Sequence, residues 1–125
     1  MTRTMILAGS FVLAATMCGH AAGLDGTYNG ISQTTEYAGD PTAYAECVDR
    51  ERVSLTVAAS AVSFGKLAGK VATDGTFAIT GNTGADNAAF TMNGTIQGER
   101  LTARWVLNKK KVDCAGEISA RRQSQ

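Results

Sequence analysis

Three carboxylates stand close together in the segment ECVDRER, at Glu46, Asp49 and Glu51. Two carboxyl groups in suitable positions can act as the acid and the base of a hydrolysis reaction. Arg50 and Arg52 alternate with these acids, however, and charges of alternating sign are typical of a solvated surface. We therefore expect the segment to begin a salt-bridged strand, and a carboxylate-dependent hydrolase is the least favoured of three hypotheses for function.

The first residues have the pattern of a secretory signal peptide. Arg3 supplies a positive charge, an apolar run covers residues 5–17, and small residues follow it. The run is shorter than the roughly 20 residues that a transmembrane helix needs. We expect residues 1–21 to be removed, which delivers the protein to the periplasm or the cell exterior without stable insertion into the membrane.

A lipid anchor on Cys18 is the alternative to complete removal of this segment. Acylated cysteines normally follow a small residue, and the bulky Met17 stands at that position here. Cleavage beyond Cys18 is the preferred hypothesis, and it leaves residues 22–125 as a single domain.

Cleavage would also remove His20, which is the only histidine of the chain. Nucleophiles activated by histidine and metal sites ligated by histidine would then be excluded. Two cysteines, Cys47 and Cys114, would stay, and an even number in an exported chain favours a disulfide over a metal site or a nucleophile. The sequence therefore predicts one disulfide, no catalytic residue, no metal and no cofactor.

Alternation of apolar and polar residues recurs along the chain, and no segment has helical periodicity. Glycine, asparagine and aspartate separate the alternating segments, at a spacing typical of all-β domains. We expect a small antiparallel meander of about eight short strands, closed into a barrel or folded into a sandwich. The expected strands include GTYNGIS (26–32), VSLTV (53–57), AVSFGK (61–66), GTFAIT (75–80), AFTMNGTI (89–96), RLTARWVL (100–107) and KVDCAGEI (111–118).

The numbering of the two cysteines agrees with a bridge inside the barrel. Cys47 shares odd numbering with Leu55, and Cys114 shares even numbering with Ile118, so unbroken strands would point both sulfurs to the core. A bridge from the second strand to the last would help to close the sheet. The early residues are acidic and the late ones basic, which indicates that the two parts lie side by side.

Two segments are candidates for binding a partner. Residues 33–46 form the longest irregular segment, and the NKKK sequence predicts a basic hairpin turn. The leading hypothesis is a binding or accessory module that presents such residues to a protein partner, for example as an inhibitor of an exported enzyme. The candidate residues are Tyr37, Tyr44, Lys109, Lys110 and Lys111.

A cavity inside the barrel is the basis of the alternative hypothesis, a carrier of a small molecule or lipid. Interior positions are mainly alanine, valine, leucine and phenylalanine, and for such a small domain we expect a filled interior. Nucleic-acid binding is disfavoured, because 12 basic residues nearly balance 11 acidic ones.

Overall fold

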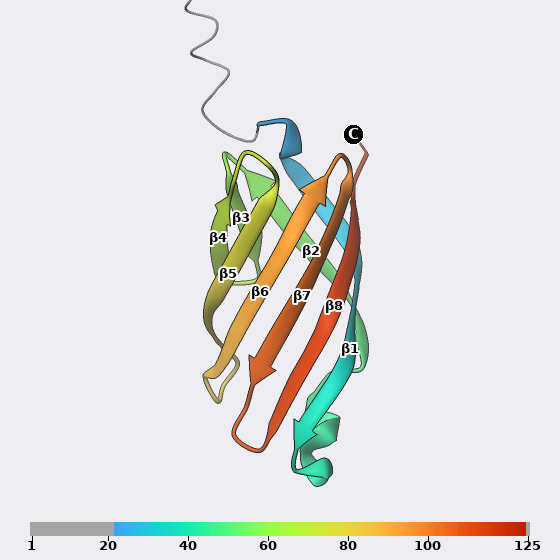
Figure 1. Cartoon of the computed structure of the whole chain (residues 1–125), viewed down its shortest axis with the longest axis vertical. Coiled ribbons are helices and arrows are strands. Elements are labelled where there is room, and N and C mark those ends of the chain that lie inside the picture. Colours follow the sequence, from blue (N-terminus) through green and yellow to red (C-terminus); the bar gives the residue numbers. More distant parts are fainter. Residues whose placement is uncertain (1–21, 125) are drawn as a thin grey trace, which may run out of the picture.

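The computed structural model describes residues 22–124, and the predicted signal peptide, with Cys18 and His20, lies outside the described residues. Eight antiparallel strands form a closed barrel in which each strand pairs with its neighbours in sequence and β1 pairs with β8 (Figure 1). The all-β meander is confirmed, and it is a barrel. Its strands are β1 (Gly26–Gly39), β2 (Arg50–Ala58), β3 (Ala61–Phe64), β4 (Leu67–Val71), β5 (Thr76–Thr83), β6 (Ala88–Gln97), β7 (Arg100–Asn108) and β8 (Val112–Arg122).

Two short 3-10 helices lie at opposite ends of the barrel (Figure 1). η1 (Ala22–Leu24) precedes β1, and η2 (Pro41–Glu46) connects β1 to β2. Neither is long enough to cross a membrane, and residues 22–124 contain no other helix that could do so.

The end of the barrel beside η1 is filled with side chains. Apart from the second half of β1, the strands point about every second residue inward, as the alternation in the sequence predicts. Tyr28, Leu55, Ile79 and Leu101 are fully buried there, and the Tyr28 hydroxyl donates a hydrogen bond to the carbonyl of Leu24 at 2.6 Å. These four residues belong to the hydrophobic core of the barrel.

The prediction of an irregular segment at 33–46 is wrong. β1 continues to Gly39, and its register against β8 shifts between Thr34 and Glu36. Such a bulge adds one residue and reverses the inward and outward positions, so the strand has no continuous alternation in its sequence. Asp40 then caps η2 by accepting a hydrogen bond from the backbone N–H of Thr42 at 2.9 Å.

The disulfide between Cys47 and Cys114 is confirmed, with 5.9 Å between the two Cα atoms. Both residues are buried. The predicted position of Cys47 on the second strand is wrong, because Cys47 follows η2 and β2 begins only at Arg50. The bridge therefore fastens η2 to β8, and hydrogen bonds between β1 and β8 close the barrel.

Two ion pairs join the acidic early part of the chain to the basic late part. Glu36 lies 3.7 Å from Arg104, and Glu46 lies 4.0 Å from Lys109. The first pair is exposed on both sides, so its contribution to stability is small. The contacts agree with the expectation that the two parts of the chain lie side by side.

Candidate ligand-binding cavity

A cavity of about 750 Å³ that is open to solvent lies in the part of the barrel between the filled end and the disulfide, and its lining includes exposed residues such as Val48 and Lys66. The expectation of a filled interior is therefore wrong for this part. The strands beside it explain why: β3 pairs with only residues 56–58 of β2, and β4 with only residues 77–79 of β5. Residues 50–55 of β2 thus pair with β1 alone, so β3 and β4 do not cover the barrel over its whole length.

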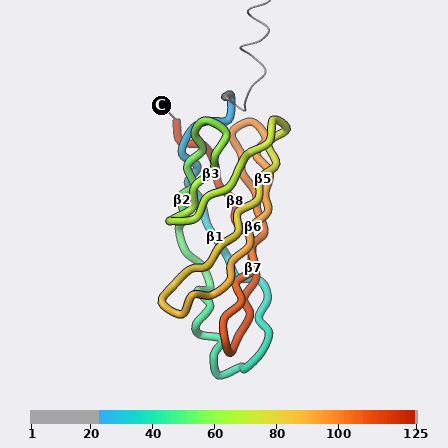
Figure 2. The backbone as a smooth tube through the Cα atoms, turned by 90° about the vertical axis from the view of Figure 1, so that its left-hand side faces the viewer, coloured from blue at the N-terminus to red at the C-terminus, as the bar shows by residue number. Residues whose placement is uncertain are grey.

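The two strand-connecting turns that border the cavity lie on the same side of the barrel. Figure 2 shows the β3–β4 turn and the β5–β6 turn on the same side. Gly65 and Lys66 of the first turn and Gly84 of the second line the cavity, together with Val48, which follows η2. A small molecule could enter between these turns and β2.

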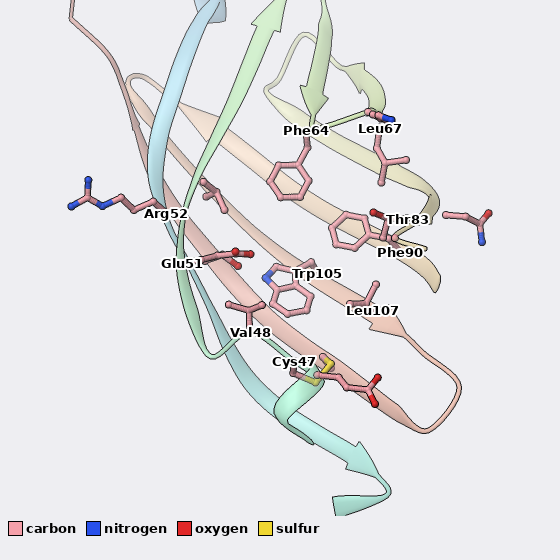
Figure 3. A pocket seen from close by; sticks show the side chains of 18 residues that line it. Cys47, Val48, Glu51, Arg52, Phe64, Leu67, Thr83, Phe90, Trp105 and Leu107 are labelled. Carbon is pink, nitrogen blue, oxygen red and sulfur yellow. A yellow bond between two sulfur atoms is a disulfide. The ribbon is translucent and has the colours of Figure 1, made fainter. Parts of the chain in front are cut away.

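Three aromatic rings form one wall of the cavity. Phe64 of β3, Phe90 of β6 and Trp105 of β7 follow one another with centroid distances of 5.8 and 6.4 Å and interplanar angles of 20° and 22° (Figure 3). Leu67 and Leu107 extend this wall. We call these five residues the aromatic wall. Its nearly parallel rings present apolar surface to the cavity.

Gly116 of β8 provides the space that Trp105 needs. A Cβ at this position would overlap the backbone oxygen of Gln33 and the indole ring of Trp105. The glycine thus allows the indole to pack against the backbone of β8, where Trp105 keeps only 8% of its surface exposed. Trp105 is therefore a buried residue of the hydrophobic core, and it also lines the cavity.

Polar groups face the cavity from β1 and β2. Ser32 is buried and lines the cavity. Glu51 is exposed, and Figure 3 shows its side chain pointing into the cavity toward Trp105, whereas Arg52 points away. The indole nitrogen of Trp105 is buried without a hydrogen-bond partner in the part of the chain that the structure describes. The cavity is therefore apolar with a few polar groups, as small-molecule sites usually are.

The two tyrosines predicted to bind a partner contact each other instead of projecting from a loop. The rings of Tyr37 and Tyr44 lie 5.2 Å apart, and the Tyr37 hydroxyl donates to a carboxylate oxygen of Asp49 at 3.1 Å. Desolvation, followed by this hydrogen bond and the charge of Asp49, raises the pKa of Tyr37. Both rings are partly buried against the core, so they help to hold η2 in place.

The three lysines of the predicted basic turn have different surroundings. Lys109 is largely buried and lies 3.3 Å from Asp86 as well as 4.0 Å from Glu46. Lys110 and Lys111 are exposed at the β7–β8 turn. Only these two of the three are therefore presented to solvent as the sequence predicts.

The three clustered carboxylates are only partly brought together. Glu46 and Glu51 both line the cavity, whereas Asp49 is the acceptor for Tyr37. Within residues 22–124, no group of three or more histidine, cysteine, aspartate or glutamate residues could hold a metal ion. The hydrolase hypothesis stays a prediction that rests on Glu46 and Glu51.

No protein-family model, curated protein sequence or solved structure matches this chain.

Sequence reasoning missed the aromatic wall as a site. Phe64, Phe90 and Trp105 all occupy inward positions in the alternating pattern, which was a usable signal. The short pairing of β3 and β4, which leaves room in front of these rings, has no comparable signal in the sequence.

Proposed function

We propose that the protein is a binding protein or carrier for a small, largely apolar molecule held inside the barrel. The aromatic wall, facing a cavity of about 750 Å³, carries this proposal. The volume falls within the range of small-molecule sites, about 300–1,000 Å³. Contact with three flat rings and two leucines would remove the apolar surface of a ligand from water, which is the main source of affinity for such molecules.

We also infer that the protein works after export, in the periplasm or outside the cell. The disulfide between Cys47 and Cys114 supports this inference, because disulfides persist in oxidising compartments and are rare in the cytosol. A soluble carrier in such a compartment would move apolar molecules through an aqueous space.

A protein-binding module is the second candidate, and two surface features favour it. Lys110 and Lys111 are exposed at the β7–β8 turn, and Val48 keeps 55% of its surface exposed although it is apolar. Affinity capture with Lys110→Glu/Lys111→Glu as the control would support this candidate if the variant lost a protein partner that the native chain retains.

A tryptophan placed inside the cavity is expected to block binding. Val53 of β2 is partly buried and lines the cavity, whereas Val106 of β7 is 39% exposed on the outer face. Val53→Trp should weaken binding of the neutral probe N-phenyl-1-naphthylamine at least tenfold, since the indole would occupy the space of the ligand. Val106→Trp adds the same group outside and should leave the affinity unchanged. The measurement is a titration that follows the fluorescence of the probe.

Equal affinity in the native chain and in Val53→Trp would place the probe elsewhere and would contradict the proposed function. Circular dichroism of both variants checks that the barrel has folded, and a loss of binding in both would point to a general disturbance of the structure.

A further inference from the structure

We infer that the free edge of β2 binds an extended segment of a partner protein in which acidic and apolar residues alternate. The segment would add to the barrel as a further strand beside the first half of β2, over the opening of the cavity. The inference goes beyond the proposed function, because it concerns the backbone at the rim of the cavity and a protein ligand.

The first half of β2 has a neighbouring strand on one side alone. Its register against β1 runs from Arg50 to Val57, whereas its register against β3 begins only at Thr56. Within residues 22–124, no strand pairs with residues 50–55 on the side opposite to β1. A strand edge without a neighbour presents backbone N–H and C=O groups to which another extended segment can bind.

The backbone groups of Arg50 and Arg52 are those that face the free side. In an antiparallel pair, successive residues turn their N–H and C=O groups alternately to one side of the strand and to the other. The N–H of Thr34 donates to the carbonyl of Asp49 at 2.9 Å, so the odd-numbered residues of this part of the chain bond to β1. The even-numbered residues therefore turn their backbone groups away from β1, where a partner strand can bond to them.

The side chains along this edge alternate between the outer face and the cavity. Figure 3 shows Glu51 pointing into the cavity and Arg52 pointing away from it. Arg50 is exposed and lies on the same face of the strand as Arg52. Neither arginine forms an ion pair or a side-chain hydrogen bond within the described part of the chain. The free edge thus carries two positive charges on its outer face.

A second copy of the chain is a poor partner for this edge. Two β2 strands paired antiparallel about residue 50, 51 or 52, with the same face outward, each bring an arginine opposite an arginine of the other copy. Like charges directly opposite each other destabilise a pair of strands. Charged side chains on an edge strand prevent such self-association, and here they also determine which strand can bind.

Acidic residues in the partner strand would neutralise the two arginines. Residues opposite Arg50 and Arg52 lie on the outer face, and cross-strand pairs of opposite charge stabilise a sheet. The partner residue between them points inward over the opening, on the side of the aromatic wall. An apolar side chain there would be removed from water, whereas an acidic one would be repelled by Glu51. An alternation of acidic and apolar residues therefore fits the edge.

Three capped octapeptides test the inference. One has alternating glutamate and valine, one has alternating lysine and valine, and the third has four glutamates followed by four valines. Each is titrated into the native chain by calorimetry. We expect the alternating glutamate peptide to bind about tenfold more tightly than either of the others, because it alone places acidic groups outward and apolar groups inward.

Reversal of the two charges on the edge should reverse the preference. Arg50→Glu/Arg52→Glu should bind the lysine peptide about tenfold more tightly than the alternating glutamate peptide. Arg100→Glu/Arg121→Glu is the matched control, because these two arginines are exposed and lie opposite each other on β7 and β8. The control should keep the native preference, and circular dichroism checks that both variants have folded.

Hydrogen exchange of single amides distinguishes a paired strand from attraction between charges alone. In the free chain, the N–H of Arg52 should exchange rapidly, and that of Val53, which bonds to β1, should exchange slowly. Saturation with the alternating glutamate peptide should slow exchange at Arg52 about tenfold and leave Val53 unchanged. Nuclear magnetic resonance of the native chain measures both rates.

The inference is overturned if the alternating glutamate peptide does not bind, binds no better than the block peptide, or leaves the Arg52 amide unprotected. A dimer of the native chain that protects this amide without any peptide would also overturn it, since the edge would then bind a second copy. The carrier proposal is tested separately with N-phenyl-1-naphthylamine, so failure of the peptide and failure of the probe are distinct results.

Discussion

Replacement of both Cys47 and Cys114 by alanine is expected to lower the free energy of unfolding by about 2–5 kcal/mol. The bridge spans 67 positions, and closing so long a loop removes much of the conformational freedom of the unfolded chain. It also fastens η2, whose Tyr44 ring packs against Tyr37 of β1 and whose Glu46 lies 4.0 Å from Lys109. Urea unfolding followed by circular dichroism measures the change.

The double variant is preferable to a single one, because a lone buried thiol would add reactions of its own. Reduction of the native chain with a thiol reagent in urea should reproduce the midpoint of the double variant. A loss below about 1 kcal/mol would show that the hydrogen-bonded barrel alone supplies the stability.

Leu55→Ala is expected to cost about 2–5 kcal/mol of unfolding free energy, and Leu107→Ala much less, about 1 kcal/mol. Leu55 is fully buried in the filled end of the barrel, so its truncation leaves a new void among tightly packed neighbours. Leu107 is only partly buried and borders a space that already exists. Truncation of Leu107 therefore removes packing contacts only on the side of the residue that faces away from the cavity.

The pair of leucine variants is compared in a single series of urea unfolding curves. Equal losses at the two positions would show that the interior is packed uniformly, and would contradict the division into a filled end and a cavity. The slope of the unfolding free energy against urea concentration should be the same in both variants. An unchanged slope confirms that the two variants differ in stability alone.

The sequence was sufficient for the antiparallel all-β meander and its disulfide, though it left the choice between barrel and sandwich open, and the reason is physical. Strands with one buried face must alternate, and residues such as Leu55, Ile79 and Leu101 do so without interruption. Cys47 and Cys114 are the two cysteines that stay if the predicted signal peptide is removed, and an even number in an exported chain favours a disulfide. The alternation can be read within a few residues of one strand, and the disulfide can be predicted from the number of cysteines.

The parts that could not be predicted depend on interruptions of the pattern. The bulge between Thr34 and Glu36 interrupts the alternation of β1, so the second half of this strand is not recognisable in the sequence. The 3-10 helix that Asp40 caps ends just before Cys47, which therefore precedes the second strand instead of lying on it. The cavity depends on the limited pairing of β3 and β4 with their outer neighbours, a property of register between segments. Register is not visible in the composition of either strand.

The most direct test of the account is to locate bound N-phenyl-1-naphthylamine by nuclear Overhauser effects. Trp105 and Val106 are neighbours in sequence whose side chains lie on opposite faces of β7, the first lining the cavity and the second exposed outside. We predict contacts from the probe to the ring protons of Trp105 and Phe90. Contacts to the methyl groups of Val106, with none to Trp105, would contradict the claim that the barrel holds its ligand inside.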